Sequence, residues 1–385
     1  MKTKNEIQLE VLQTVLDSFN IKKKNAIVEA ATGVGKTKIA YDLIKVIVSH
    51  VPTAKILIVV PTELLRDEGW KSEATKWDCE YIWENNIERV CYASLNKIKN
   101  TEYNLVILDE IQNITDNNAE FFFSNNNKIK KILGLTATLP KEFEKAKILK
   151  NLALEVCYKI PLDEAVENKL VSPYEIVLIK TKLDNLQPIV KFGNKLNPFY
   201  LTEEKAYIKL SKDIEFAKVT NNFKKIDMLI FSRMRVLYNS INKTSVANFI
   251  INNLIEKDER TLIFCGSIKQ AEMLCPYTYH SKSSNISLQK FKSGEVNTLS
   301  CVNALNEGHN IPNVDNAVIT QVTSKERHLI QRVGRIIRYK ENHVGKIYLI
   351  VIENTVDEQW MQKALENIDN LKIETIYANE LIPVI

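Results

Sequence analysis

The sequence predicts an α/β protein built from two tandem lobes, each a doubly wound parallel sheet, with a helical arm inserted in the second lobe. Two observations predict this fold. Short apolar runs alternate with amphipathic helical stretches in both halves of the chain, which is typical of parallel strands joined by helices. In the second half, a stretch of roughly 75 residues has apolar residues at helical spacing and no strand-like run.

The first lobe is assigned to residues 1–158. Its expected strands are short apolar runs, as strands buried on both faces of a parallel sheet should be. They are residues 26–29, 56–60, 89–92, 105–108 and 132–135. The alternation breaks near Tyr158, ahead of a short helical stretch at 163–168, and this break predicts an interlobe linker at 159–172.

The second lobe is assigned to residues 173–385, beginning with an extended segment at 174–183. Four further strands are expected at 261–265, 298–302, 317–320 and 346–352. The helical arm covers about residues 200–257, where apolar side chains recur every three or four residues.

A glycine-rich loop is expected between the first strand and the helix that follows it. Residues 30–37 read Ala-Ala-Thr-Gly-Val-Gly-Lys-Thr, in the strand–loop–helix context of a phosphate-binding loop. Gly33 and Gly35 let the backbone turn tightly, so that its N–H groups converge on an anion. Lys36 would reach the β- and γ-phosphates, and the Thr37 hydroxyl would ligate Mg²⁺. The predicted cofactors are therefore ATP, bound by residues 32–37, and Mg²⁺.

Two carboxylates, Asp109 and Glu110, follow the apolar run 105–108. Ligands of open α/β sheets bind at the carboxyl ends of the strands, which is where these side chains should lie. Asp109 is expected to hold Mg²⁺, and Glu110 is expected to orient or deprotonate the water that attacks the γ-phosphate.

Composition narrows the class of protein. Apolar residues make up 45% of the chain, enough for large cores, while no apolar run is long enough to span a bilayer. The N-terminus lacks the apolar stretch of a secretion signal, so a soluble cytoplasmic protein without membrane contact is expected. The six cysteines have neither Cys-x-x-Cys spacing nor histidines at metal-site spacing, which argues against zinc and disulfides.

The arm concentrates positive charge. Residues 218–243 carry six cations against Asp227, an excess as large as the net charge of +5 of the whole chain. The cations are Lys218, Lys224, Lys225, Arg233, Arg235 and Lys243. Such a run fits either a solvated helical surface or an arm that follows a phosphate backbone.

Further motifs follow in a fixed order along the chain: 31–37, 60–62, 109–110, 136–138, 307–308 and Gln331-x-x-Gly-Arg335-x-x-Arg338. With these motifs the sequence resembles superfamily 2 helicases, most of all the compact DNA translocases of the UvsW, XPB and restriction-enzyme motor group. The resemblance covers nearly the whole chain. It implies two RecA-like lobes and a nucleic-acid-stimulated ATPase that couples ATP hydrolysis to movement along DNA or to its remodelling.

The resemblance also implies roles at the nucleotide. Gln8 resembles the glutamine that reads adenine, and Asn310 stands where an aspartate commonly contacts the ribose. Gln331, Arg335 and Arg338 resemble the motif that supplies catalytic cations to the γ-phosphate. A planar guanidinium suits this role because it spans two phosphate oxygens and keeps its proton.

Other roles concern nucleic acid and coupling. Residues resembling the backbone contacts of the family are Pro61, Thr62, Tyr92, Ser94, Gly266, Ser267 and Asn303. To these we add the arm residues Lys224, Lys225, Arg233 and Arg235. Thr136 and Thr138 resemble the motif that couples hydrolysis to strand movement. Gln112 is a neutral amide where the family often has His or Asp, and it can both donate and accept hydrogen bonds.

The expected partner is DNA, whether single-stranded, duplex or branched, bound by a monomer that works with a replication or recombination protein. Two alternatives stay open. One is an RNA helicase, because the motifs do not read the 2′-hydroxyl. The other is an ATP-gated nucleic-acid clamp or assembly subunit without productive unwinding. Nuclease activity has no support, since no second carboxylate cluster has metal-site spacing.

Overall fold

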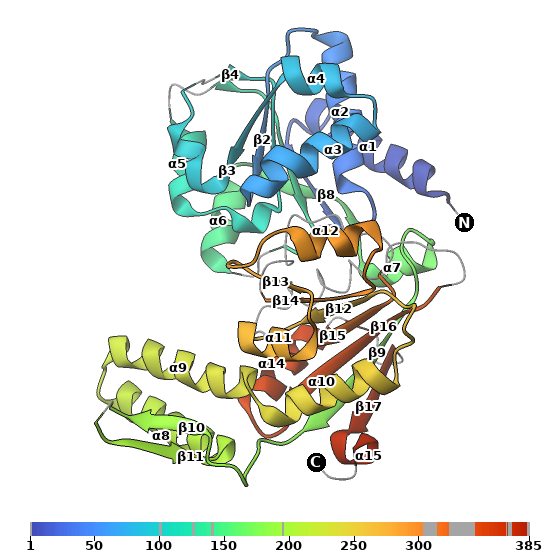
Figure 1. The fold of residues 1–385 in the computed structure, drawn as a ribbon. Coiled ribbons are helices and arrows are strands. Elements are labelled where there is room, and N and C mark those ends of the chain that lie inside the picture. The colour runs from blue at the N-terminus through green and yellow to red at the C-terminus, as the bar shows by residue number, and fades with distance from the viewer. Residues whose placement is uncertain are drawn as a thin grey trace. The chain divides into compact units, whose positions relative to one another are not determined.

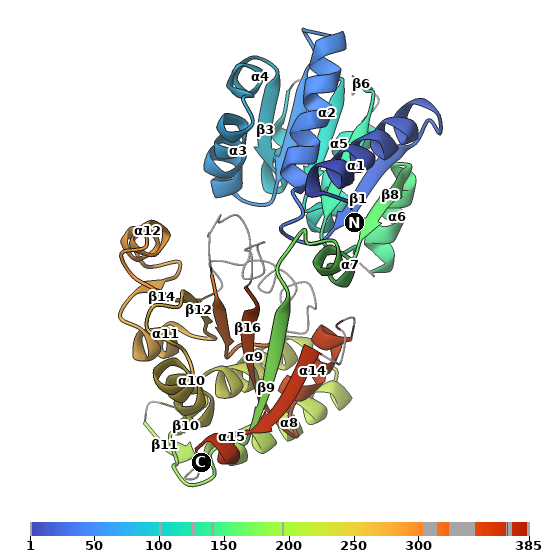
Figure 2. The ribbon, with the colours of Figure 1, turned by 90° about the vertical axis from the view of Figure 1, so that its right-hand side faces the viewer.

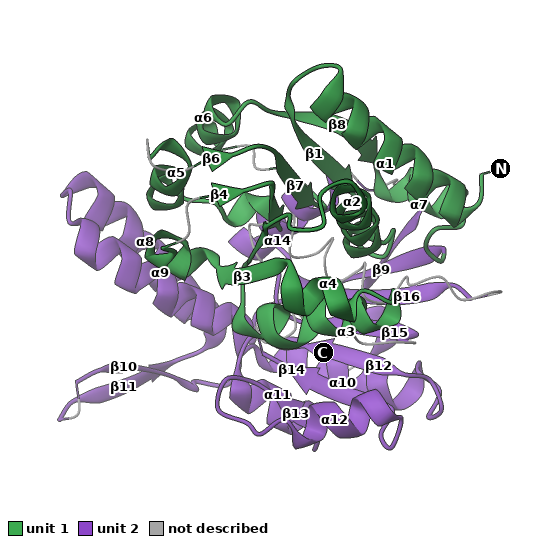
Figure 3. Ribbon diagram, turned by 90° about the horizontal axis from the view of Figure 1, so that it is seen from above, with its two compact units in different colours: residues 1–172, 306–311, 337–342 green, residues 173–305, 312–336, 343–385 purple. Residues whose placement is uncertain are grey.

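The computed structural model describes residues 2–99, 102–124, 128–139, 142–194, 196–302, 314–322, 343–366, 368 and 372–382 (Figure 1). The described residues form two compact units (Figure 3). The first extends to Ser172, and the second contains all described residues from Pro173 onwards. Each unit has a parallel sheet with helices packed on it, so the predicted fold class is confirmed.

The first unit contains a six-stranded parallel sheet. In spatial order its strands are β3 (Ile87–Cys91), β2 (Ile56–Val60), β5 (Leu105–Asp109), β7 (Ile132–Thr136), β1 (Asn25–Ala30) and β8 (Leu154–Ile160). Its helices are α1 (Lys4–Asn20), α2 (Lys36–His50), α3 (Trp70–Lys76), α4 (Glu80–Asn85), α5 (Asp116–Phe123), α6 (Phe143–Asn151) and α7 (Leu162–Glu167). Strands β4 (Glu102–Tyr103) and β6 (Lys128–Ile129) form a separate two-stranded parallel sheet.

The strand order of the first unit positions three loops at one edge of the sheet. Strands β5, β7 and β1 are neighbours and run parallel, so the residues that follow them emerge side by side. Strands β2, β5 and β7 are buried along their whole length, which explains why their sequences are continuous apolar runs.

Strand β8 occupies part of the segment that the sequence assigns to the end of the first lobe and the linker. Only Leu154 and Ile160, at its two ends, are buried, so it lacks the apolar run of a central strand. Residues 159–172 belong to the first unit, where β8 pairs with β1 and is followed by α7.

The second unit contains a seven-stranded parallel sheet (Figure 2). In spatial order its strands are β13 (Thr278–Tyr279), β14 (Thr298–Cys301), β12 (Thr261–Phe264), β15 (Asn316–Ile319), β16 (Gly345–Ile352), β9 (Tyr174–Thr181) and β17 (Ile373–Tyr377). The helices of this sheet are α10 (Ile241–Asn253), α11 (Ile268–Leu274), α12 (Ile286–Ser293), α14 (Val356–Leu365) and α15 (Ala378–Leu381).

An arm leaves the second unit after β9. It consists of an antiparallel hairpin, β10 (Val190–Gly193) with β11 (Pro198–Leu201), and two helices, α8 (Glu203–Val219) and α9 (Phe223–Tyr238) (Figure 1). The sequence predicts the helices but not the hairpin, whose residues are mostly exposed. The hairpin turn needs glycine at position 193, because φ is +84° and a Cβ would lie 2.2 Å from the Asn197 carbonyl oxygen.

Glu203 ties the two ends of the arm together. Its buried carboxylate accepts hydrogen bonds from the backbone N–H groups of Ile241 at 2.8 Å and Asp184 at 3.2 Å. Burial raises the pKa of Glu203, and the two hydrogen bonds oppose that rise.

Among the described residues, no helix combines the length and apolarity needed to cross a membrane.

Candidate functional site

The loop between β1 and α2 has the backbone of an anion-binding cradle. Gly33 and Gly35 have φ values of +97° and +104°, a region that favours glycine. A Cβ on Gly35 would lie 2.4 Å from Nε2 of Gln8, whose side chain donates to the Val34 carbonyl oxygen at 2.9 Å. Gln8 therefore fixes the loop through its hydrogen bond to Val34. The N–H groups at the N-terminus of α2 stay available to bind an anion.

Polar side chains in this loop are available for a ligand. The ammonium of Lys36 donates to the Ala30 carbonyl oxygen at 2.9 Å, and the Thr37 side chain is half-buried in the first turn of α2. The Thr32 hydroxyl is buried and has no hydrogen-bond partner within the described ranges. A buried hydroxyl without a partner is costly, so this orphaned group fits a loop that binds phosphate oxygens.

Asp109 ends β5 and is held by two aromatic side chains. Trp70 Nε1 donates to Asp109 Oδ2 at 2.9 Å, and the Tyr92 hydroxyl donates to the Asp109 carbonyl oxygen at 3.0 Å. Burial and the neighbouring charge of Glu110 raise the pKa of Asp109 to about 7, while Trp70 and Lys36 oppose the rise. Two adjacent carboxylates, one of them buried, repel each other when both are charged, and a divalent cation such as Mg²⁺ would relieve that repulsion.

Glu110 has a strained backbone. Its φ of 49° and ψ of 57° lie in the left-handed region, which costs a residue other than glycine about 1 kcal/mol or more. Its half-buried carboxylate accepts a hydrogen bond from Gln112 Nε2 at 2.7 Å. Strain of this kind persists where the surroundings fix a side chain for a task.

Gln112 links Glu110 to the loop after β7. Its Oε1 accepts from the Thr136 hydroxyl at 2.7 Å, and that hydroxyl also lies 2.8 Å from the Thr138 carbonyl oxygen. Lys145 holds the Gln112 backbone by donating to its carbonyl oxygen at 2.7 Å. The amide thus donates to Glu110 on one side and accepts from Thr136 on the other, so that two direct hydrogen bonds connect these side chains.

The residues expected to contact nucleic acid in the first unit differ in burial and in their hydrogen bonds. Pro61 and Thr62 follow β2, and the Thr62 hydroxyl accepts from the Leu65 N–H at 3.3 Å. Ser94 is half-buried in the turn after β3. Tyr92 is only 6% exposed, because its hydroxyl reaches inward to Asp109. In this structure the Tyr92 side chain supports the carboxylate site and not a surface contact.

Gly266 and Ser267 in the second unit are used for packing within that unit. A Cβ on Gly266 would lie 2.5 Å from the Tyr238 Cβ, so only glycine allows this approach of β12 to the end of α9. The Ser267 hydroxyl donates to Asn239 Oδ1 at 2.5 Å and accepts from the Gln270 N–H at 3.2 Å. These contacts join the arm to α11.

The cationic run of the arm does not form one surface. Lys224, Lys225 and Arg235 are exposed, whereas Arg233 is half-buried over the Tyr207 ring. The remaining two cations are paired, Lys218 with Glu215 at 2.9 Å and Lys243 with Asp357 at 2.5 Å. Lys243 fits neither interpretation of the run, because its side chain is fully buried.

Five predicted site residues, Asn303, Asn310, Gln331, Arg335 and Arg338, lie outside the described residues. Trp70, in contrast, is a site residue that sequence reasoning misses. Trp70 lies 39 positions before Asp109, and the packing of α3 brings the two side chains together. No local sequence pattern predicts such a contact.

Two family models match the chain. Residues 2–141 match the res subunit of type III restriction enzymes, and residues 242–340 match the helicase conserved C-terminal domain. Among characterised proteins, the DNA 3'-5' translocase XPB2 of Sulfurisphaera tokodaii is 24% identical over 390 residues, covering 94% of this chain and 86% of that protein.

Solved structures share the fold. The ATP-dependent type ISP restriction-modification enzyme LlaBIII bound to DNA aligns with a TM-score of 0.60 at 16% identity, over 96% of this chain and 31% of that one. Dbp5 of S. cerevisiae bound to RNA and ADP BeF3 aligns with a TM-score of 0.61 at 12% identity, over 98% of this chain and 91% of that one. At such identities the likeness establishes the fold of the two units.

Proposed function

Because the chain is a superfamily 2 helicase or translocase, and thus a nucleic-acid-dependent ATPase, we propose that its ATP hydrolysis drives movement along DNA or remodelling of DNA. The observation that carries this proposal is the chain of hydrogen bonds from Glu110 through Gln112 to Thr136. A simple ATPase needs the carboxylate alone. A motor needs the state of the hydrolytic carboxylate to be transmitted to another loop, and this connection can do that.

The nucleotide is held by the loop after β1. In the proposed complex, the N–H groups at the start of α2 and the Thr32 hydroxyl bind phosphate oxygens, and Lys36 leaves the Ala30 carbonyl to reach the β- and γ-phosphates. Thr37 and Asp109 would hold Mg²⁺, which neutralises phosphate charge when bound. Glu110 orients the attacking water and accepts its proton.

DNA is favoured over RNA as the substrate because XPB2, which aligns with 94% of this chain, is a DNA translocase. RNA stays the alternative, since the fold is shared with an RNA-bound protein. A clamp without turnover is disfavoured by the strained Glu110 backbone, because a purely structural carboxylate gives no reason to maintain that strain.

The proposal is tested by ATP turnover measured side by side with single-stranded DNA, duplex DNA, forked DNA and single-stranded RNA. We expect stimulation by at least one form of DNA well above that by RNA of equal length, because the similar protein XPB2 is a DNA translocase. Equal or greater stimulation by RNA would favour the RNA helicase. Turnover that no nucleic acid changes would contradict both.

A second prediction concerns Trp70. The indole N–H stabilises the charged form of Asp109, so Trp70→Phe should raise the pKa of Asp109 further above its ordinary value. Asp109 must be ionised to hold Mg²⁺, and turnover at limiting Mg²⁺ should therefore fall off at a higher pH in the variant than in the unmodified protein. The measurement is turnover against pH between roughly 5 and 9, at several Mg²⁺ concentrations.

Trp77→Phe is the matched control for this experiment. It removes the same indole N–H from the same region, but the N–H of Trp77 donates to Glu73 at 2.8 Å and not to the site. The nucleotide titrates identically in all three proteins, so a difference between them belongs to the protein. The decisive quantity is the pH below which turnover falls. If Trp70→Phe leaves this pH unchanged, or if Trp77→Phe shifts it by the same amount, the Trp70 contact does not tune Asp109.

A further inference from the structure

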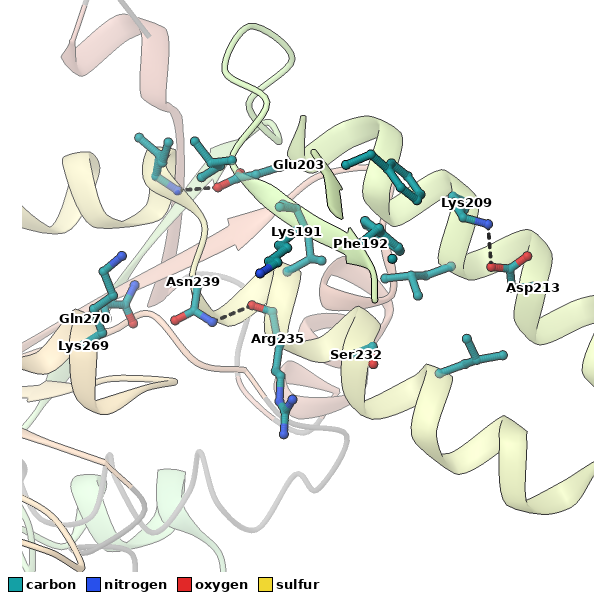
Figure 4. A pocket seen from close by; sticks show the side chains of 18 of the residues that line it. Lys191, Phe192, Glu203, Lys209, Asp213, Ser232, Arg235, Asn239, Lys269 and Gln270 are labelled. Carbon is teal, nitrogen blue, oxygen red and sulfur yellow. Dashed lines mark hydrogen bonds and ion pairs between the residues drawn. The ribbon is translucent and has the colours of Figure 1, made fainter. Parts of the chain in front are cut away.

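A cavity of about 1260 Å³ lies in the second unit, between the hairpin of the arm, helices α8 and α9, the start of α10 and helix α11 (Figure 4). We call it the arm cavity. None of the motifs shared with helicases uses the hairpin, and the proposed function assigns no role to this space. Its size would accommodate a ligand larger than a typical small-molecule site allows.

The arm cavity has an apolar wall with an aromatic pair. Phe192 and Phe199 stack across the hairpin, with ring centroids 5.6 Å apart and an angle of 21° between the planes. Phe199 is 47% exposed, and Met228 on α9 and Met273 on α11 are 60% and 63% exposed. Flat and polarisable side chains left open to water in this way are suited to stack against planar rings.

The rim of the arm cavity is cationic. Lys191, Lys225, Arg235 and Lys269 line it and are exposed, and none of them forms an ion pair with another described residue. They come from the hairpin, from α9 and from α11, as Figure 4 shows for Lys191, Arg235 and Lys269. Four unpaired positive charges around one cavity repel one another, and a polyanion would relieve that repulsion.

The acidic groups in the lining do not offset this charge. Asp213 is 3.0 Å from Lys209, so these two neutralise each other. Glu203 is buried, and its carboxylate is occupied by two backbone N–H groups. The occupant that complements the arm cavity is therefore negatively charged and also carries apolar, planar groups.

We propose that the arm cavity binds single-stranded DNA, with bases stacked on Phe199 and the methionines and with phosphates at Lys191, Lys225 and Arg235. A duplex presents phosphates but keeps its bases inside, so it would leave the aromatic wall uncovered. An acidic peptide would neutralise the cations but brings no planar rings. The inference goes beyond the proposed function, since this strand contact requires neither ATP nor the loops of the first unit.

The charge contribution is tested with the full chain and no nucleotide, by fluorescence anisotropy of a roughly 12-nucleotide dT oligomer over a salt series. The triple variant Lys191→Gln, Lys225→Gln, Arg235→Gln should flatten the slope of log affinity against log salt by about 2, since each lost contact removes about 0.7 for a single strand. The control triple variant replaces Lys205, Lys212 and Lys218 by Gln on α8, outside the cavity lining. It removes the same charge from the same arm, and its slope should change by less than about 1. Equal slopes in the two variants would overturn the proposal.

The stacking contribution is tested by comparing dT with an abasic oligomer of the same length. The unmodified protein should bind dT about 10-fold more tightly, and Phe199→Leu, which keeps an apolar side chain but loses the ring, should bind the two more equally. Phe216→Leu is the control, because Phe216 is also an exposed aromatic residue of the arm but does not line the cavity. Circular dichroism melting curves of all variants verify that the arm stays folded.

Location is tested by ultraviolet cross-linking with 5-iododeoxyuridine in the oligomer, followed by mass spectrometry of the peptides. Adducts are expected on the peptide that contains Phe199. Adducts confined to other parts of the chain would overturn the assignment. So would abasic and dT oligomers that bind equally well while polyglutamate displaces both, a result that would identify an acidic peptide as the ligand.

The experiments distinguish a failure of the arm-cavity proposal from a failure of the proposed function. DNA-stimulated ATP turnover with no strand bound at the arm cavity would contradict the cavity alone. A strand cross-linked to Phe199 in a protein whose turnover no DNA stimulates would contradict the motor alone.

Discussion

Replacing Lys243 with alanine is expected to lower the free energy of unfolding of the second unit by about 3–5 kcal/mol. The side chains of Lys243 and Asp357 are both fully buried, and their charged atoms are 2.5 Å apart. The ammonium also donates to the Thr320 carbonyl oxygen at 2.8 Å. The loss would be large because removal of the lysine leaves the Asp357 carboxylate buried without a counter-charge.

The surroundings of Asp357 make this loss hard to relieve. Burial raises the pKa of Asp357, and the contact with Lys243 is the largest influence that opposes the rise. One carboxylate oxygen accepts from the Ile352 N–H at 3.0 Å, and the other has no hydrogen-bond partner among the described residues. Without Lys243, the carboxyl group would have to take up a proton or draw water into the core.

Hydrogen exchange of peptides from β15 and β16 measures the effect. A loss of about 3 kcal/mol should speed exchange there more than 100-fold. Lys225→Ala removes an exposed cation from the neighbouring arm and should change the stability by no more than about 0.5 kcal/mol. The double variant Lys243→Met, Asp357→Asn should recover part of the stability, because it removes both charges and keeps an acceptor for Ile352. A single variant as stable as the control would show that the pair contributes nothing.

Lys243 also shows where sequence reasoning reaches its limit. Lys225 and Lys243 have the same side chain, and both lie in a helical, cation-rich stretch. Only the packing of α10 against the sheet, and the arrival of Asp357 from more than a hundred positions away, separate the buried lysine from the exposed one. No local pattern carries that information.

The central strands of both units were predictable because their burial is visible in the local sequence. Strand β2 has the bounds that its sequence predicts, and β5 and β7 extend one residue further, because a strand buried on both faces must be apolar throughout. The edge strands β8 and β17 and the hairpin of the arm escaped prediction, since exposed faces accept polar residues.

The same contrast holds at the candidate site. The loop after β1 and the carboxylates after β5 were predictable because each motif consists of adjacent residues. The partners that fix their geometry, Trp70 and the inward-turned Tyr92, come from other elements and depend on packing. The resemblance implies that Gln112 links the carboxylates to the coupling motif, and the structure supplies the hydrogen bonds to Glu110 and Thr136 that form this link.

Glu110→Gln is expected to reduce ATP turnover by 10²-fold or more while nucleotide binding persists. The substitution keeps the shape of the side chain but removes its charge and its ability to accept a proton. Lys36→Ala should act differently, by weakening nucleotide binding itself, because that ammonium contributes to the bound state. Single-turnover hydrolysis and a separate nucleotide titration distinguish the two effects.

The hydrogen bonds around Glu110 sharpen this expectation. In the unmodified protein Gln112 donates to the carboxylate and accepts from Thr136, so that its orientation is fixed by both neighbours. A glutamine at 110 offers a carbonyl oxygen in place of the carboxylate, so the connection to Thr136 can survive while proton transfer is lost. The matched control is Glu120→Gln, the same change at an exposed position on α5, which should leave turnover unaltered. Full turnover by Glu110→Gln would show that another group activates the water, and the connection through Gln112 would then have no role in coupling.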